Sequence, residues 1–429
     1  MENPLNMDRL SYGKPSIADV QGDDLSHTVK LTISQGLNDG GVLCFRLPSD
    51  PERFTDLNGT LLQLEMSLVN TDGSIIRDKD EVFQVPTRKK NKDGEEVQTM
   101  VQIERKQDLV CLDAGGMHSL FKSCDVYFND THVSNMSMYP YTSALSRYLG
   151  STEGNRAQWS HFDETFDYQI GDPSLTLLDN PVWLPPKRTA QRERIVLTGR
   201  IFADVLTSTR QFLPPGVSLG IDLRRAPDAF SLISTDNTKS YRAHINWASL
   251  YVKRIKIETP LLPALRDSFQ NGCHLTYNRL ESYAMSIPRG SKVFRWVNCL
   301  NNAPLPNRLY LAFVTQSCLR GTQTEASTYF VNLKLESLNW QLNGKDLFVE
   351  PMRLKIEKSL TGTVTQKSDL RQSYLALLDV FNEIEDQLSP NRLSYELFVR
   401  GVTVFVAELS KCGEKRGSIG PLDLEVFLI

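Results

Sequence analysis

The chain of 429 residues has no run of about 18 consecutive apolar residues, so no segment is predicted to span a membrane. Its first residues, MENPLNMDRL, lack the basic and then apolar pattern of a secretory signal. Positive charge is not in excess either: 48 Lys and Arg stand against 51 Asp and Glu, a net charge of −3. Because such a chain has no general attraction for a phosphate backbone, we predict no specific nucleic-acid site.

Cysteine and histidine are few and dispersed. The seven cysteines are an odd number without a CxxC pair, which indicates buried, reduced thiols in an intracellular product. The six histidines include no His-x-His, and the nearest two, His118 and His132, are 14 residues apart (132 − 118 = 14). No Walker loop, HExxH motif or dinucleotide fingerprint is present. We therefore predict no catalytic, cofactor-binding or metal-binding residues and no cofactor.

What the sequence does contain is many short strands. Residues 61–68, LLQLEMSL, alternate apolar and polar, as in a half-buried strand. Similar runs are VKLTISQ, GVLCFRL, CDVYFN, RIVLTGRIFADVL, VSLGIDL, ASLYVKRIKI, RLYLAFVTQ, VNLKLESLNWQL, ELFVRGVTVFVAEL and LDLEVFLI. Three helices are predicted: 141–149, 374–381, and one from Thr259 to near Gly272. Many strands with few helices are typical of β-sandwiches.

Four landmarks recur in the same order in the two halves of the chain. They are Phe45-Arg46 and Phe294-Arg295, the turns at Asn129 and Asn343, the glycines before long apolar strands at Gly199 and Gly401, and the Asp-containing runs after Gly220 and Gly420. A repeat of this length indicates two copies of one domain. We predict an all-β fold of two tandem eight-stranded jelly-roll β-sandwiches with a few short helices in the loops. The first roll, with long loops, covers 1–257 and the second covers 258–429.

The two predicted rolls differ at their ends. In the first, residues 248–257 follow the LGIDLRRA strand and should close the sandwich. In the second, the corresponding strand LDLEVFLI has nothing after it. We therefore expect the second roll to lack its final strand. Two explanations stay open: another chain supplies the strand at the edge, or the sequence is a truncated copy.

Several segments share a pattern with one known family. An Asp-Leu-Arg strand leads into R-x-x-D-x-F-x-L at 225–232, and an L-x-V-x-[KR]-[VI] strand covers 250–255. An I-P-x-G turn lies at 287–290, an L-P-x-R-L strand start at 305–309, and a Y-P-Y helix start at Tyr139. In these segments, most densely over 120–350, the chain resembles the double jelly-roll major capsid proteins of Polinton (Maverick) elements and adintoviruses.

The resemblance implies a structural protein and no enzyme. It implies a homotrimer whose six sandwiches form a near-hexagonal capsomer of an icosahedral shell. Capsomer contacts would be with further copies, and penton or minor capsid proteins would be other partners. The protein would reside in the virion capsid after synthesis inside the host cell, with a nuclear location before assembly left open. Two alternatives stay open: a tandem β-sandwich ligand- or glycan-binding protein of a host genome and, with less support, a bicupin-type enzyme.

Three local features invite a functional reading. Gly216-Val-Ser218-Leu-Gly220 matches the G-x-S-x-G pattern of a nucleophile elbow, but a strand follows where the elbow needs a helix, so we predict a structural turn. The basic run 87–92 is predicted to be a solvated hairpin loop, with nuclear import as the alternative. The aromatic-rich insertion 151–192 should cover its own sandwich or contact a neighbouring subunit.

Overall fold

A computed structural model gives the fold of the chain. It describes residues 26–33, 41–74, 76, 80–90, 96–106, 110–165, 194–209, 211–234, 240–256, 269, 272–300, 303–323, 325–331, 333, 335–347, 352–353, 356–357, 367–368, 370–380, 393–400, 402–409 and 422–428.

The elements of the first part of the chain are β1 (Ser26–Ile33), β2 (Val42–Leu47), β3 (Arg53–Asn70), β4 (Asp80–Lys90), β5 (Glu96–Lys106), β6 (Val110–Leu112), η2 (Gly116–Leu120), β7 (Phe121–Phe128), β8 (Thr131–Met136), α1 (Tyr139–Gly150), α2 (Glu153–Asp163), β9 (Ile195–Arg200), α3 (Asp204–Thr207), β10 (Leu219–Arg225), α4 (Asp228–Ser231), β11 (Leu232–Ser234) and β12 (Tyr241–Lys256). Those of the second part are β13 (Val293–Trp296), β14 (Arg308–Ala312), α6 (Gln316–Arg320), β15 (Leu335–Leu342), β16 (Lys345–Asp346), β17 (Met352–Arg353), β18 (Ile356–Glu357), β19 (Lys367–Ser368), α7 (Arg371–Val380), α8 (Tyr395–Arg400), β20 (Val404–Glu408) and β21 (Leu422–Leu428).

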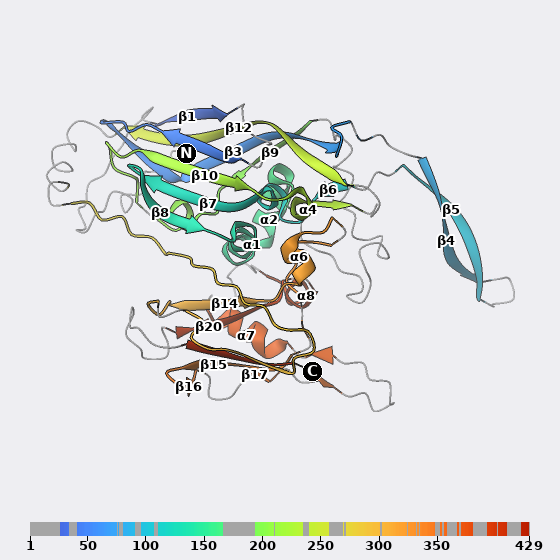
Figure 1. Cartoon of the computed structure of the whole chain (residues 1–429). Coiled ribbons are helices and arrows are strands. Elements are labelled where there is room, and N and C mark those ends of the chain that lie inside the picture. Colours follow the sequence, from blue (N-terminus) through green and yellow to red (C-terminus); the bar gives the residue numbers. More distant parts are fainter. Residues whose placement is uncertain are drawn as a thin grey trace.

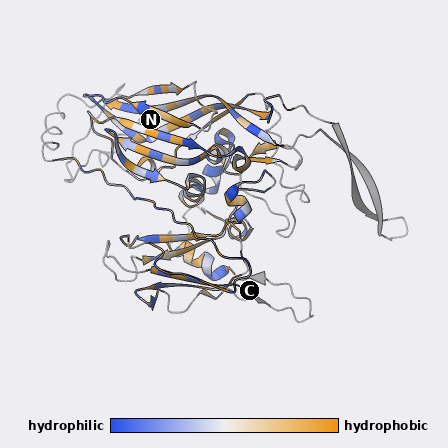
Figure 2. Ribbon diagram, in the orientation of Figure 1, coloured by the Kyte–Doolittle hydropathy of each residue, from blue (hydrophilic) through white to orange (hydrophobic). Residues whose placement is uncertain are grey.

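The first roll is a sandwich of two four-stranded antiparallel sheets, with strand orders β1-β12-β3-β9 and β2-β10-β7-β8 (Figure 1). Along the chain, successive strands cross repeatedly from one sheet to the other, which is the jelly-roll topology. On β3, Leu62, Leu64, Met66 and Leu68 are buried and alternate with half-buried residues, because neighbouring side chains of a strand point to opposite faces. The hydropathy colours of Figure 2 alternate along the strands accordingly.

The second roll repeats this arrangement with fewer described strands. One sheet has the order β13-β21-β15-β16, with β17 also paired to β15, and the opposite sheet is β14-β20. β21 lies between β13 and β15 as β10 lies between β2 and β7, so the predicted alignment of LDLEVFLI with LGIDLRRA is confirmed. Within the described residues, no strand of the second roll takes the positions of β1 and β12. The fold is thus all-β, with tandem jelly rolls and short helices.

The two Asn turns that mark the repeat have the same backbone geometry. In the β7–β8 hairpin, Asn129 and Asp130 have φ of 47° and 64°, and in the β15–β16 hairpin Asn343 and Gly344 have φ of 53° and 74°. Two successive residues at positive φ form the tight hairpin turn whose twist matches that of the strands, and Asn, Asp and Gly adopt it most readily.

Two predicted strands were wrong over half of their length. RIVLTGRIFADVL forms β9 only to Arg200 and then the helical turn α3, while ELFVRGVTVFVAEL begins as α8 and becomes β20 only at Val404. Short apolar runs cannot be assigned to strand or buried helix by their period alone. The predicted helices near Tyr141 and Tyr374 are α1 and α7, and the one beginning at Thr259 lies outside the described residues.

The two rolls lie one above the other, so that their sheets form successive layers (Figure 1). Helix α1 lies between the β2-β10-β7-β8 sheet and the second roll. Its residues Tyr141 and Tyr148, with Phe230 of α4, belong to the same buried apolar cluster as the second sandwich. The ring centroids of Tyr141 and Phe330 are 6.2 Å apart. The junction is therefore apolar and continuous with the second core.

Candidate functional site

The G-x-S-x-G segment is a structural turn. Gly216 has φ of 83°, and the segment runs directly into β10 with no helix after Ser218. The Asn129 side-chain oxygen accepts hydrogen bonds from the Ser218 backbone N–H at 2.9 Å and from its hydroxyl at 3.3 Å. The serine thus ties the β10 start to the β7–β8 turn, and no nucleophile elbow is formed.

Replacing Ser218 by Ala should lower the free energy of unfolding by less than about 1 kcal/mol, because only the longer of the two hydrogen bonds is lost. Urea denaturation of both proteins measures this change. An assay with a p-nitrophenyl ester should give the same background rate for both. An esterase activity that the substitution abolishes would contradict the structural role.

The basic run 87–92 is placed differently from the prediction. Residues 87–90 belong to β4 and pair with residues 96–99 of β5, while 91–95 lie outside the described residues. The run therefore begins on a strand and not in a loop. The basic residues before Asp-Gly correctly indicated a hairpin. They did not show how far the pairing of β4 with β5 extends toward the turn.

The described part of the insertion 151–192 covers its own roll. It forms α2, whose N-cap Thr152 accepts a hydrogen bond from the Asn155 N–H. Helix α2 contacts β9 and η2, and it buries Arg156 and Asp163. Phe162 is 53% exposed, and its ring lies against Trp159. The aromatic residues from Phe166 onward lie outside the described residues.

The histidines and cysteines do not assemble into a site. Among the described residues, no group of three or more His, Cys, Asp and Glu side chains could hold a metal ion. Cys111, Cys124, Cys299 and Cys318 are buried free thiols, as predicted, whereas Cys44 is exposed. Burial raises the pKa of Cys111 to about 12, so its thiol is far from the reactive thiolate form.

A buried carboxylate joins the two rolls. Asp113, which is 0% exposed, lies between β6 and η2 of the first roll. Its oxygens accept hydrogen bonds from the backbone N–H of Ser327 at 2.8 Å, from the Thr328 hydroxyl, and from the N–H of Gly115 at 3.2 Å. Two of these donors come from the segment before β15, so the carboxylate of one roll binds a backbone N–H and a hydroxyl of the other.

A buried histidine lies beside this junction. His118 Nδ1 is 3.0 Å from the Tyr139 hydroxyl, and its Nε2 is 3.9 Å from the Asp163 carboxylate. The Phe202 N–H donates to the same Tyr139 oxygen at 3.4 Å, so the tyrosine proton is free to point at Nδ1. Burial lowers the pKa of His118 to about 4; Asp163 opposes this shift and Arg147 adds to it. At neutral pH the imidazole is therefore uncharged.

The segment 272–290, which connects the rolls, is an extended strap. On its way, the backbone N–H groups of residues 276, 278 and 280 donate to side chains of Gln211, Ser208 and Asp204 at 2.8, 2.8 and 3.0 Å. Donors at alternate residues lie on one side of an extended chain. Side chains of the first roll thus replace the neighbouring strand for this part of the strap and fix its path.

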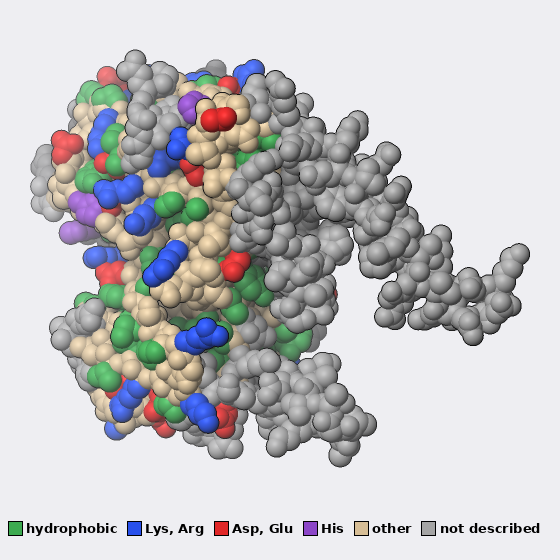
Figure 3. Space-filling view, turned by 45° about the vertical axis from the view of Figure 1, so that its right-hand side comes forward, with side chains coloured by type: hydrophobic (Ala, Val, Ile, Leu, Met, Phe, Trp, Pro, Cys, Tyr) green, Lys and Arg blue, Asp and Glu red, His purple; other side chains and the backbone are tan. Residues whose placement is uncertain are grey.

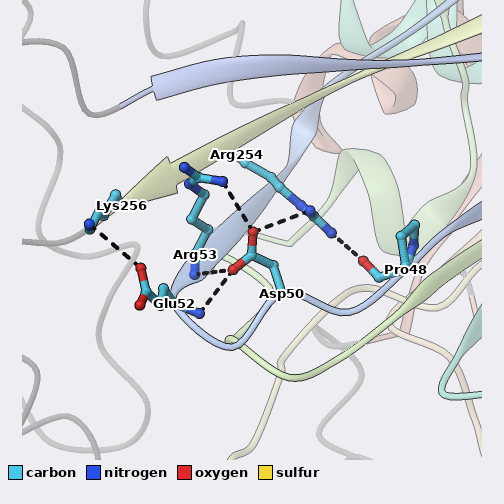
Figure 4. Close-up of polar contacts among 6 residues, drawn as sticks. All are labelled: Pro48, Asp50, Glu52, Arg53, Arg254 and Lys256. Carbon is cyan, nitrogen blue, oxygen red and sulfur yellow. Dashed lines mark hydrogen bonds and ion pairs between the residues drawn. The ribbon is translucent and has the colours of Figure 1, made fainter.

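An ionic corner fixes the loop between β2 and β3 (Figure 4). Asp50 accepts hydrogen bonds from the N–H groups of Glu52 and Arg53 at 3.0 and 3.2 Å, and Arg254 Nη1 lies 3.3 Å from its second oxygen. Arg254 also donates to the Pro48 carbonyl. Burial alone would raise the pKa of Asp50, but the Glu52 N–H and the two arginine charges outweigh it and hold that pKa below its usual value.

Each roll has an arginine–aspartate ion pair between the corresponding two strands. Arg46 of β2 binds Asp222 of β10, and Arg295 of β13 binds Asp423 of β21 at 2.9 Å. In each roll the arginine and the aspartate are diagonal neighbours on the outer side of the sheet, but Asp222 lies two residues after the residue opposite Arg46, whereas Asp423 lies two residues before the residue opposite Arg295. The Phe-Arg landmarks and the Asp-containing runs after Gly220 and Gly420 therefore supply one arginine–aspartate pair in each roll, although the register of the pair differs.

Replacing Arg46 or Arg295 by Ala should lower the free energy of unfolding by a similar, small amount, about 0.5–1 kcal/mol, because both arginines are half exposed. The effects should add in the double variant, since the sites are in different rolls. Urea denaturation at low salt measures all three changes. Strong non-additivity would contradict the independence of the two pairs.

Sequence reasoning missed Asp113, Asp204, Asp50 and the buried role of His118. Their partners lie up to 215 residues away, and no local pattern marks them. Together these contacts fix loops, the strap and the junction, and none of them places an activated nucleophile beside a base. Within the described ranges, none of the helices has the length and apolar character needed to cross a bilayer.

Comparison with known proteins gives the fold and little sequence similarity. No protein-family model matches the chain, and no curated protein matches it. A chain in the cryo-EM structure of the Sputnik virophage matches with a TM-score of 0.54 and 13% identity, over 99% of this chain and 86% of that chain. The mavirus major capsid protein matches with a TM-score of 0.45 and 10% identity, over 100% of this chain and 88% of that chain. The Sputnik match extends over both rolls, so the tandem architecture as a whole is shared.

Proposed function

We propose that this chain is a major capsid protein of an icosahedral virus or virus-like element, of the kind encoded by Polinton elements and adintoviruses. The observation that carries the proposal is the tandem jelly-roll fold, shared over 99% of the chain with a protein of a virophage particle. The contacts described above serve rigidity, and we assign the protein no enzymatic role. We divide it into a first roll over 1–257 and a second over 258–429.

The proposed assembly is a homotrimer. Three chains with two similar rolls place six sandwiches around one axis, and the resulting tile is nearly hexagonal although its symmetry is threefold. Such tiles cover the flat parts of a shell and leave the five-fold vertices to penton or minor capsid proteins. In this proposal the protein's location is the virion capsid.

The test is the assembly state of the full-length chain. Size-exclusion chromatography with light scattering should give three times the protomer mass, or larger shells, and negative-stain microscopy should show tiles of hexagonal outline. A folded, monodisperse monomer at micromolar concentration would contradict the proposal. A monomer that also bound a specific glycan on an array would support the ligand-binding alternative.

A further inference from the structure

The outermost face of the first roll is positively charged. On the outer side of the β1-β12-β3-β9 sheet, the exposed cations, here called the basic face, are Lys30, Arg194, Arg200, Arg242 and Lys253. Two acids lie on this side among the described residues: Glu65, which is bound to Arg194 at 2.8 Å, and the buried Asp56, which lies opposite Lys253 in the β3–β12 register. Lys30 Nζ lies 5.5 and 5.3 Å from the ring centroids of Trp247 and Tyr251, which lie near the centre of the face.

The outermost face of the second roll has the opposite charge. On the outer side of the β13-β21-β15-β16 sheet, the acidic side chains, here called the acidic face, are Glu336, Asp346, Asp423 and Glu425. Arg295 is on the same side and is bound to Asp423. Val293, which is 51% exposed, adds apolar surface at the β13 edge. By contrast, the side of the molecule seen in Figure 3 carries cations and acids interspersed.

The order of the layers relates these two faces. Within one chain, the β2-β10-β7-β8 sheet of the first roll faces the β14-β20 sheet of the second, with α1 between them (Figure 1). The basic and acidic faces are therefore the two free ends of the stack. If the first roll of a second copy is placed on the second roll as the second roll is placed on the first within one chain, the acidic face of one copy meets the basic face of the next. Three chains contribute six rolls, so a closed ring requires each roll to be turned by about 60° from the one before it.

We propose that the acidic face of one copy docks on the basic face of a second copy, and that this contact holds the trimer together. The inference rests on the proposed capsid function and names the surfaces through which it is achieved. The contact is heterologous, with different surfaces on the two partners, as a closed cyclic ring requires. Opposite charges guide the encounter, and Trp247, Tyr251 and Val293 supply apolar area inside the charged rim.

The experiment uses charge reversal on each face. Arg242→Glu with Lys253→Glu reverses two exposed cations of β12 for which the structure gives no ion pair. Glu336→Lys with Glu425→Lys reverses two acids of the other face. Arg289→Glu with Arg320→Glu is the matched control for the basic-face variant, because both replace two cations by two acids and the control positions are exposed and off both faces. Light scattering across a dilution series, with circular dichroism to confirm folding, gives the trimer dissociation midpoint.

Each two-site reversal should raise the protomer concentration at half dissociation at least tenfold, and the four-site variant should regain most of the loss. The control should stay within threefold of the wild type. Raising NaCl from 0.05 to 0.5 M should also weaken the wild-type trimer, because salt screens the facing charges. The salt series and the basic-face variant test the proposed contact even if the acidic-face variant does not fold.

Two results would overturn the inference. If the wild type is a trimer and both reversals behave as the control does, the contact lies elsewhere although the capsid proposal survives. If instead the basic face binds single-stranded DNA in fluorescence anisotropy, Arg242→Glu with Lys253→Glu abolishes that binding, and the trimer is unaffected, then the face serves nucleic acid. A monomeric wild type would refute the inference together with the proposed function.

Discussion

The Asp113→Ala protein should unfold in two separate thermal transitions where the wild type unfolds in one. The substitution leaves the Ser327 N–H and the Thr328 hydroxyl, both buried, without their carboxylate acceptor. Each unsatisfied buried donor costs roughly 1–3 kcal/mol, so the junction should lose about 3–5 kcal/mol. Because Asp113 joins the two rolls, this free energy is lost from the interaction that makes them unfold together. Differential scanning calorimetry measures both the number of transitions and their midpoints.

Thr328→Val is the matched control for this prediction. It removes one donor of the same cluster and keeps the bond from the Ser327 N–H to Asp113. Its cost should therefore stay below about 2 kcal/mol, with a single transition. If Asp113→Ala unfolds in one step within about 1 kcal/mol of the wild type, the rolls are held together by the apolar contacts of α1 and not by this carboxylate.

The fold could be predicted from the sequence wherever a local pattern decides the structure. Alternation of apolar residues predicted β3, and the Asn turns, with positive φ at Asn129 and Asn343, marked equivalent hairpins in both rolls. The pattern failed at the ends of apolar runs. There α3 and α8 replace expected strands, because burial on all sides makes helix and strand equally apolar. Gly199 lies inside β9, whereas residue 401 precedes β20. The two glycines therefore do not occupy equivalent positions in the two rolls.

The contacts that organise the rolls could not be predicted in the same way. Asp113 and Ser327 are 214 residues apart in sequence, and Asp204 meets the strap 76 residues later. A lone Asp after an apolar strand carries no signal of its partner, since the pairing arises only after both sandwiches have formed. The Arg46–Asp222 and Arg295–Asp423 pairs are the exception. Both pairs lie in segments that recur in the two halves of the chain. The sequence therefore marked these residues as landmarks, although it did not show that they form ion pairs.

Lowering the pH from about 6.5 to about 4 should destabilise the protein through His118. Burial holds the pKa of His118 at about 4 in the folded protein, against about 6.5 in an unfolded chain. Between these values the unfolded chain binds a proton that the folded protein does not, so the free energy of unfolding falls as the pH falls. The slope approaches 1.4 kcal/mol per pH unit, and the total is about 3 kcal/mol. Asp50 adds a loss of the same sign at lower pH: because its pKa is lowered in the folded protein, its stabilising charge is lost only below about pH 4.

The His118→Gln variant separates this titration from packing. Glutamine keeps an acceptor for the Tyr139 hydroxyl and has no proton to gain, so the variant should be less stable than the wild type at pH 7 but should depend less on pH. Urea denaturation at pH 7, 6, 5 and 4.5 gives both curves, and their difference should shrink by about 2–3 kcal/mol toward the acid end. Parallel curves would mean that His118 gains its proton without cost in the fold, with Asp163 at 3.9 Å outweighing burial.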